Sequence, residues 1–496
     1  MAMLRLSSHQ NQNGNILITR TLFKMIIIFV LAIFLLLQNS STNLVFATSQ
    51  FNIVKYLPGF QGPLPFVLET GYVGVGETET DENSAELFYY FLESENNPKQ
   101  DPLLLWLTGG PGCSAFSGLA FEIGPITFKN EEYNGSLPNL ILRPHSWTKV
   151  SNIIFLDLPV GTGFSYPKTE GAAQQSTWKL VHNAHQFLRK WLIDHPKFIS
   201  NEVYIAGDSY SGLPIPIIVQ EISYGNEGGL QPWINLQGYI LGNPVTWPAH
   251  DDNYKIPFNH GMGLISDELY ESLQKNCRGE YKNIDPQNVF CLEDIQSYQE
   301  TISGVYEVHI LESKCEFGLP NPLEANGRRR LLIHKANTIF TSSLTLPPLN
   351  CRSHAYFLGA YWANDANVQN ALHIRKGSIG KWKRCNFDIP FKHEIDNSFE
   401  YHVNLSRKGY RSLIYSGDHD MKVPFVATQA WIRSLNYSIV DDWRQWYSNS
   451  QVAGYTRTYS NRMTFATVKG AGHTAPEYKR EECLAMLSRW ISNNPL

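Results

Sequence analysis

The chain has 496 residues, which is enough for one large domain with an insertion or for two or three domains of ordinary size. Hydrophobic residues make up 43% of it, a value typical of globular proteins. The net charge is −4 and the sequence has no basic stripe with interleaved aromatic residues, which argues against a nucleic-acid-binding function, and we expect no nucleic-acid partner.

The N-terminus has the pattern of a secretory signal peptide. Arg20 and Lys24 precede an apolar run at residues 25–37, and a small-residue cleavage pattern ends at Ala47. We predict cleavage after Ala47 and leave residues 1–47 out of the fold. The alternative is a signal anchor, but the apolar run is short for a bilayer span, so we expect no stable membrane anchor after cleavage.

Entry into the secretory route makes disulfides and N-glycans expected features of the mature chain. Seven cysteines cannot all pair within one chain, and their spacing does not choose the connectivity. No CxxC pair or His/Cys cluster has zinc spacing, so we predict no metal site. Three Asn-x-Ser/Thr sequons in the mature part predict surface glycans, with the possibility that any one is unused: Asn134, Asn404 and Asn436.

Strands and helices then alternate up to residue 244. A strand, a loop and a second strand are expected over residues 72–94, and the strands that follow are long and apolar. The expected strands lie at 103–107, at 153–156, before Ser209 and in "INLQGYILGNP", with helices in "TWKLVHNAHQFLRKWLIDHP" and after Gly212. This alternation predicts an α/β fold with a mostly parallel sheet, whose first part spans residues 48–244.

The pattern changes over residues 245–364, which are richer in turns and hold four of the seven cysteines. We interpret this region as an inserted cap or lid. Arg328 to Arg330 lie in a turn-rich stretch of it, which predicts a processed linker near 325–335; the alternative is an exposed basic loop. The second part of the core follows over 365–496, with a helix in "YWANDANVQNALHI", strands at 412–420 and 463–473, and a helix at 479–492.

Ser209 lies in the pattern Gly207-x-Ser209-x-Ser211-Gly212, between an expected strand and an expected helix. A strained turn of this kind exposes a nucleophilic serine above a sheet. The last glycine comes one place late, and the alternative is a tight turn with an idle serine.

A serine nucleophile needs a base and an acid, which α/β-hydrolases supply in the chain order Ser, acid, His. "YSGDHD" offers Asp418 and Asp420, and "VKGAGHTAPE" offers His473, each after an expected strand. Their order and placement fit a catalytic triad. A structural role for His473 is the alternative, and the residues alone do not choose between the two aspartates.

The oxyanion of such a reaction needs two preorganised donors. One is expected to be the backbone N–H of Tyr210, directly after the nucleophile. The other is expected in "TGGPGCS", where Gly109 and Gly110 could turn backbone amides toward the substrate. The alternative is a simple turn before Pro111.

The chain resembles the serine carboxypeptidase family from about Phe51 to the C-terminus, in several long motifs that occur in the family's order. These motifs are "WLTGGPGCSAFSG", "FEIGP", "NIIFLDLPVGTGFSY", "GDSYSG", "LGNP", "YSGDHDMKVP" and "GAGHTAPEYKREECL". The resemblance implies an α/β-hydrolase fold with an inserted cap, the triad Ser209, Asp420 and His473, and an oxyanion hole at Gly110 and Tyr210. Similarity to the plant members implies the disulfides Cys113–Cys385, Cys277–Cys291 and Cys315–Cys351, with Cys483 free.

Two positions depart from the peptidase pattern of that family. Peptidase members of the family typically have an asparagine and a glutamate in the network that hydrogen-bonds the C-terminal carboxylate of the substrate. This chain has Thr108 and Asp208 at those two positions. The third position of that network is unchanged and is Glu122. We expect Thr108, Gly109, Glu122 and Asp208 to bind substrate. The chain is instead similar to the plant acyltransferase branch.

That branch takes an acyl group, often hydroxycinnamoyl or benzoyl, from a 1-O-β-glucose ester and passes it to an alcohol or amine acceptor. The donor ester is already activated, so we expect no cofactor. The alternatives are a serine carboxypeptidase and an inactive binding relative.

Arg384 precedes Cys385, whose implied bridge to Cys113 would hold it near the oxyanion loop. A guanidinium there could bind an acidic acceptor or shape the pocket, as in malate-using relatives; a structural arginine is the alternative. The signal peptide and the resemblance together favour a vacuolar location over the apoplast, and oligomeric state is not readable from the sequence.

Overall fold

The computed structural model describes residues 52–76, 81–315 and 347–496. The predicted signal peptide and the Arg328–Arg330 segment lie outside the described residues. Both therefore stay predictions.

A twelve-stranded sheet runs through the described chain, in the order β1-β2-β3-β7-β4-β10-β11-β13-β16-β15-β14, with β8 paired to β3. The six central strands from β7 to β16 are parallel, and the strands at both edges are antiparallel. The sheet strands are β1 Asn52–Ile53, β2 Leu68–Val75, β3 Ala85–Leu92, β4 Leu103–Leu107, β7 Asn152–Leu156, β8 Tyr166–Pro167, β10 Val203–Asp208, β11 Leu236–Gly242, β13 Arg411–Gly417, β14 Ile439–Ser448, β15 Gln451–Tyr459 and β16 Met463–Val468. The predicted mostly parallel α/β sheet is confirmed.

The central strands are apolar on both faces because helices cover both. Along β4, Leu104 and Trp106 belong to one hydrophobic core, while Leu103 and Leu105 belong to the other. This alternation follows from the two-residue period of a strand. Two packed layers therefore enclose the sheet.

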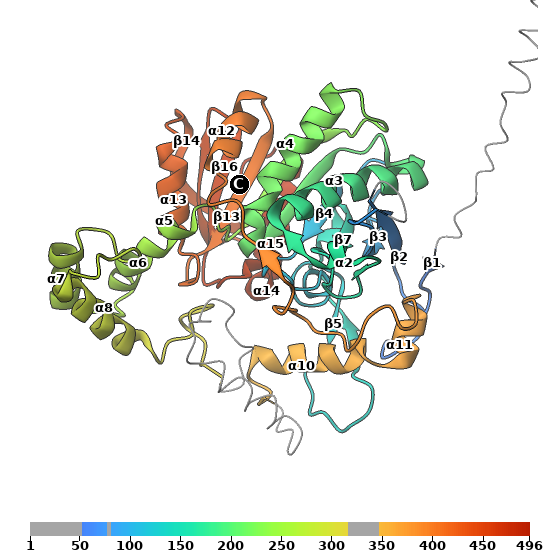
Figure 1. Cartoon of the computed structure of the whole chain (residues 1–496), viewed down its shortest axis with the longest axis horizontal. Helices are drawn as coiled ribbons and strands as arrows, with labels where there is room; N and C mark the ends of the chain where they lie inside the picture. The colour runs from blue at the N-terminus through green and yellow to red at the C-terminus, as the bar shows by residue number, and fades with distance from the viewer. Residues whose placement is uncertain (1–51, 77–80, 316–346) are drawn as a thin grey trace, which may run out of the picture. The chain divides into compact units, whose positions relative to one another are not determined.

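One layer contains α3 Thr177–Asp194 and α4 Pro214–Glu227, which lie beside each other (Figure 1). Ser176 caps α3 by accepting a hydrogen bond from Lys179 N. The opposite core includes Met486 and Trp490 of α15 Arg480–Ile491. The predicted helices in these regions are confirmed.

The helix expected in "YWANDANVQNALHI" is two helices, α10 Arg352–Ala363 and α11 Ala366–Ala371. The break occurs because the Asp365 side chain accepts hydrogen bonds from Asn367 N and Val368 N and so begins a new helix. The strands predicted at 412–420 and 463–473 are too long. They end at Gly417 and Val468, and the chain turns into loops after each.

The antiparallel pair β14 and β15 was not predicted. Asn449 and Ser450 join the two strands, and both have positive φ angles, 48° and 60°. Two such residues form the tight turn that suits the twist of a hairpin.

The predicted cap, residues 245–364, contains α5 Pro248–Asn253, α6 Lys255–Gly261, α7 Asp267–Cys277, α8 Val289–Ile302 and α10. Helices α7 and α8 pack together and are joined by the Cys277–Cys291 disulfide. Between α10 and β13, the described chain contributes no strand to the twelve-stranded sheet. The cap boundaries remain a prediction.

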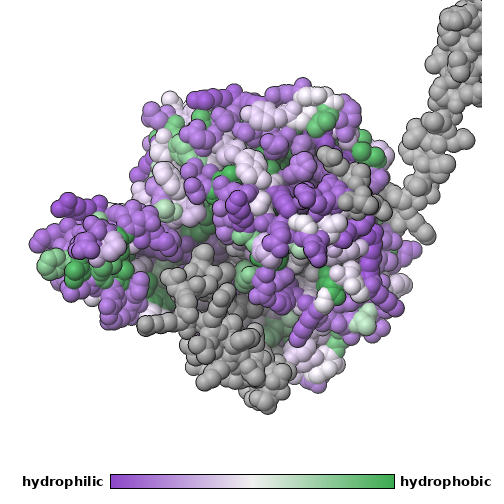
Figure 2. Space-filling model, viewed as in Figure 1, coloured by the Kyte–Doolittle hydropathy of each residue, from purple (hydrophilic) through white to green (hydrophobic). Residues whose placement is uncertain are grey.

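Shorter elements of the described chain include β5 Ile126–Phe128 with β6 Leu140–Leu142, β9 Gln175–Ser176 with β12 Phe391–Lys392, α2 Glu170–Ala173, α12 Phe399–Arg407, α13 Phe425–Ser434 and α14 Ala475–Tyr478. Hydrophilic residues cover most of the face shown in Figure 2. Among the described helices, none is both long and apolar enough to cross a membrane.

Candidate active site

Three loops at the carboxyl ends of parallel strands carry the residues predicted to form a triad. Ser209 follows β10, Asp420 follows β13 and His473 follows β16. Strands β10, β11, β13 and β16 are neighbours, so their carboxyl ends meet at one edge of the sheet. Ligand sites of open α/β sheets form at this edge.

Ser209 begins a tight turn, η4 Ser209–Gly212, with φ +55°, a conformation that non-glycine residues rarely adopt. The flanking glycines are required by close contacts. A Cβ atom at Gly207 would lie 2.2 Å from Leu107 O, and one at Gly212 would lie 2.6 Å from Pro244 Cβ. Such strain is typical of a nucleophile held above a sheet.

The late glycine of the motif has a structural explanation at Ser211. Its Oγ donates a hydrogen bond to Leu107 O over 2.9 Å, so the small polar side chain ties the turn to the neighbouring strand β4. Ser211 is buried, unlike a serine exposed for reaction.

The three predicted residues form a continuous chain of hydrogen bonds. His473 Nε2 lies 2.7 Å from Ser209 Oγ, and His473 Nδ1 lies 2.7 Å from Asp420 Oδ2. Asp420 is fully buried. Burial lowers the pKa of His473, but the facing Asp420 carboxylate outweighs it and raises that pKa above its ordinary value.

Asp420 is oriented by three further donors. Asn243 Nδ2 donates to its Oδ2 over 2.8 Å, and the backbone amides of Lys422 and Val423 donate to its Oδ1. Asp418 instead lies 2.5 Å from His419 Nδ1 and accepts from Gly470 N. The geometry therefore favours Asp420 as the partner of the histidine.

The predicted oxyanion loop lies directly against the nucleophile. A Cβ atom at Gly109 would lie 2.7 Å from Ser209 Cβ and 3.0 Å from Tyr210 N, so only glycine fits there. Gly110 follows with φ +125°. The loop is held by the Cys113–Cys385 disulfide and by a hydrogen bond from Asn386 N to Gly112 O.

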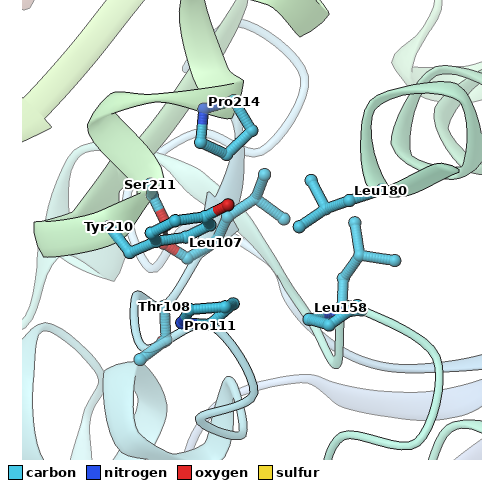
Figure 3. Close-up of a pocket in the computed structure, with 9 residues that line it drawn as sticks. Leu107, Thr108, Pro111, Leu158, Leu180, Tyr210, Ser211 and Pro214 are labelled. Carbon is cyan, nitrogen blue, oxygen red and sulfur yellow. Dashed lines mark hydrogen bonds between the residues drawn. The ribbon is translucent and has the colours of Figure 1, made fainter. Parts of the chain in front are cut away.

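The Tyr210 side chain lines a small cavity together with Thr108 and Pro111 of this loop. Figure 3 shows its ring among Leu107, Pro111 and Pro214, with Leu158 and Leu180 on the far side. Burial there raises the pKa of Tyr210 to about 12. The ring anchors the turn, while the backbone N–H of Tyr210 stays beside Gly109.

Two buried carboxyl groups lie beside the triad. Asp208 Oδ1 accepts a hydrogen bond from Gly109 N over 3.0 Å, and burial raises the pKa of Asp208 to about 6. Burial raises the pKa of Glu122 well above its usual range, with Asp208 and Glu477 adding to the effect. The third predicted position, Thr108, accepts a hydrogen bond from Trp106 Nε1 over 3.1 Å.

Glu477 belongs to this acidic cluster and was not predicted from the sequence. It is buried, accepts from Tyr356 Oη and Thr474 Oγ1 over 2.9 Å, and lies 3.6 Å from Arg352 Nη1. The sequence feature that could have indicated it is its position four residues after the predicted base His473 in "GHTAPE".

Arg384 lies next to the oxyanion loop, as the resemblance implied. Its carbonyl accepts from Ser114 N, its Nη1 lies 3.3 Å from Ser117 Oγ, and its guanidinium lies 4.2 Å from the centre of the Tyr356 ring. A role in binding substrate remains a prediction.

The cysteines pair as the resemblance implied: Cys113–Cys385, Cys277–Cys291 and Cys315–Cys351, with Cys483 free and buried. Two of the sequon asparagines, Asn134 and Asn436, are exposed, whereas Asn404 is partly buried and donates to Gln220 Oε1. Glycosylation remains a prediction at all three sites. Among the residues that the structure describes, no group of three or more His, Cys, Asp or Glu side chains is placed so that it could hold a metal ion.

A serine on a strained strand-to-helix turn, hydrogen-bonded to a histidine and a buried aspartate, gives this chain the architecture of an α/β-hydrolase. Residues 58–493 match the Serine carboxypeptidase family, and the chain belongs to that family.

Curated relatives cover almost the whole chain. "Serine carboxypeptidase-like 19" of Arabidopsis thaliana is 56% identical over 90% of this chain and 95% of its own length, and "Serine carboxypeptidase-like 12" is 53% identical with the same coverage. A prohormone-processing carboxypeptidase from Saccharomyces cerevisiae is similar in structure, with a TM-score of 0.65, 18% identity, and coverage of 86% of this chain and 91% of its own. That structural similarity supports the α/β-hydrolase fold alone.

Proposed function

We propose that this protein is an acyltransferase that moves an acyl group from a 1-O-β-glucose ester to an alcohol or amine acceptor through an acyl-enzyme on Ser209. The acyl group is of the hydroxycinnamoyl or benzoyl type. The catalytic residues are Ser209, Asp420 and His473, and the backbone amides of Gly110 and Tyr210 stabilise the oxyanion.

The observation that carries this proposal is the pair Thr108 and Asp208, where the peptidases that the chain resembles have asparagine and glutamate. Both shorter side chains are engaged by the protein itself: Thr108 by the Trp106 indole and Asp208 by the Gly109 amide. They are less able to reach a substrate carboxylate than the longer pair. An uncharged sugar leaving group also avoids repulsion by the buried carboxyl groups.

In the first half-reaction, His473 Nε2 takes the proton of Ser209 as its Oγ bonds to the ester carbonyl carbon. Asp420 keeps the imidazole oriented, and the two backbone amides stabilise the negative oxygen. As the tetrahedral intermediate collapses, the ester bond to glucose breaks and His473 returns the proton to the departing sugar oxygen.

In the second half-reaction, the acceptor alcohol or amine attacks the acyl carbonyl while His473 removes its proton. The bond to Ser209 Oγ then breaks, and the serine recovers the proton from His473. Water attacking in the same way would give hydrolysis, so transfer requires a site that binds the acceptor more readily than water.

The second candidate is a serine carboxypeptidase, and retention of Glu122 favours it. Its Oε2 has no hydrogen-bond partner among the described residues and its pKa is raised by burial, so a protonated Glu122 could face a substrate carboxylate. An inactive binding relative is disfavoured because the three triad side chains are within hydrogen-bond distance.

The test offers the purified mature protein two substrates. One is a hydroxycinnamoyl-glucose ester with a mixed set of alcohol and amine acceptors, and the other is a blocked dipeptide with a free C-terminus. We expect glucose release with formation of a new ester or amide, lost in Ser209→Ala. Release of a C-terminal amino acid instead would identify a peptidase.

The three disulfides are consistent with a protein of the oxidising secretory route. Within that route we favour the vacuole over the apoplast. Cleavage near residues 325–335 would leave two pieces joined by Cys113–Cys385 and Cys315–Cys351, since each bridge connects one side of that segment to the other.

A further inference from the structure

A short segment of the predicted cap crosses the two loops that carry Asp420 and His473. We call residues 305–312, which follow α8, the cap strap. Three backbone hydrogen bonds join it to these loops: Met421 N to Glu307 O at 3.0 Å, His473 N to Val308 O at 2.8 Å, and Ile310 N to His419 O at 3.1 Å. The cap strap therefore hydrogen-bonds to both the loop that carries Asp420, which we call the acid loop, and the loop that carries His473, which we call the base loop.

The cap strap also brings a charge to the acid loop. The carboxylate of Glu307 lies 2.9 Å from Lys422 Nζ, and both side chains are partly buried. The backbone amide of Lys422 donates to Asp420 Oδ1 over 2.7 Å. The residue that pairs with Glu307 is thus the same one that helps to orient the acid of the triad.

We propose that Glu307 is a positioning residue of the triad: its carboxylate holds the Lys422 ammonium in place and offsets that positive charge beside the Asp420–His473 couple. The inference rests on the proposed catalytic role of the triad. It does not depend on whether the acyl acceptor is an alcohol, an amine or water.

The electrostatics of the site agree with this role. The Asp420 carboxylate outweighs burial and raises the pKa of His473, while the Lys422 ammonium acts in the opposite direction. Burial raises the pKa of Glu307, but Lys422 and Lys255 outweigh burial and lower it, so this carboxylate is charged near neutral pH. Without Glu307, the positive charge of Lys422 would act on His473 with less compensation.

Other ionisable groups lie around the pair and the imidazole. Asp252 forms ion pairs with Lys255 and Lys282 at 2.8 and 2.7 Å, on the cap side. His309 belongs to the cap strap itself and Tyr478 to α14, while Asp208, Asp418 and His419 come from the strand ends and their loops. These groups are unchanged in the variants below, so a difference between variants reports the charge that was removed, at Glu307 or at Lys422.

The test measures how fast a fluorophosphonate labels Ser209 across the pH range in which histidine titrates. Attack on phosphorus releases fluoride and passes the serine proton to His473, so the rate rises as the imidazole becomes neutral. In Glu307→Gln we expect the midpoint of this rise to move to lower pH. In Lys422→Gln we expect it to move to higher pH, because the opposing positive charge is gone.

The matched control is Glu227→Gln, which breaks the ion pair of Glu227 with Lys408, formed between α4 and the end of α12. Its midpoint should equal that of the wild type. Opposite shifts in the Glu307 and Lys422 variants would support the inference, and unchanged midpoints in both would overturn it even if labelling slowed. A wild-type protein that is not labelled, like Ser209→Ala, would instead overturn the proposed triad.

Discussion

Asp208 has a raised pKa because it is buried, and this has a measurable consequence for stability. Its pKa rises from an ordinary value of 3.8 to about 6, and a separation of roughly two pH units corresponds to about 3 kcal/mol. The folded protein keeps its proton between these pKa values while the unfolded chain loses it. Asp208 therefore lowers the free energy of unfolding as pH rises through this window, and the loss is complete above the folded pKa.

We therefore expect Asp208→Asn to raise the free energy of unfolding near neutral pH by up to about 3 kcal/mol. The amide oxygen can still accept the hydrogen bond from Gly109 N. The gain should vanish below the ordinary aspartate pKa, where both states of the wild type are protonated.

The assay is urea unfolding of wild type and variant, with disulfides intact, at acidic and neutral pH, alongside donor turnover. Stability should rise while turnover falls, a combination that simple damage to the fold does not produce. The matched control is Asp157→Asn, since burial also raises the pKa of Asp157 to about 6. A pH-independent difference for Asp208→Asn would refute the reasoning.

The control should gain less stability than Asp208→Asn because Asp157 uses both oxygens as acceptors. Its Oδ1 accepts from Ser114 Oγ and Ala115 N, and its Oδ2 accepts from Phe164 N. An amide there must turn its donor group toward another donor, which costs about 1–3 kcal/mol. Because the raised pKa of Asp157 predicts the same gain of about 3 kcal/mol on neutralisation, this cost should leave Asp157→Asn with a smaller gain near neutral pH than Asp208→Asn, and should make it less stable than the wild type at acidic pH.

Two further substitutions probe the geometry of the site. Asn243→Ala removes the hydrogen bond to Asp420 Oδ2, so kcat/KM should fall about tenfold or more, corresponding to about 1.5–3 kcal/mol, while the fold is kept; steady-state kinetics and thermal unfolding check this. Gly109→Ala places a Cβ atom 2.7 Å from Ser209 Cβ and 3.0 Å from Tyr210 N, so fluorophosphonate labelling should be lost, and labelling at the wild-type rate would contradict the close contact.

Local patterns predicted those parts of the fold that depend on local physics. The apolar run at 103–107 has the same bounds as β4. A strand that is buried on both faces is apolar at every position, so the first and last apolar residues mark its ends. The strands around Asp420 and His473 were predicted too long. Gly417 is followed directly by Asp418, His419 and Asp420, and Val468 by Lys469 and a stretch of small residues. At both points the chain leaves the sheet and turns into a loop that carries the site.

Order along the chain predicted Ser209, His473 and an aspartate of "YSGDHD", and the family resemblance was needed to choose Asp420 over Asp418. Glu477 and the cap strap were not predicted, because their contacts join segments far apart in sequence. Tyr356 and Glu477 meet across more than a hundred residues, and no local pattern of either one indicates the other. The roles of such residues depend on tertiary packing, which the periodicity of the sequence does not predict.

The acidic residue before the nucleophile can be understood from the end of β10. Asp208 is the last residue of β10, whereas Ser209 begins the turn η4 with a φ of +55°, and the two side chains have different partners. Asp208 binds the Gly109 amide of the oxyanion loop, while Ser209 contacts His473. The end of β10 therefore contacts both the oxyanion loop that follows β4 and the base in the loop that follows β16. A longer glutamate would reach past the Gly109 amide toward the substrate, which is the reach that the proposed acyltransferase does not need.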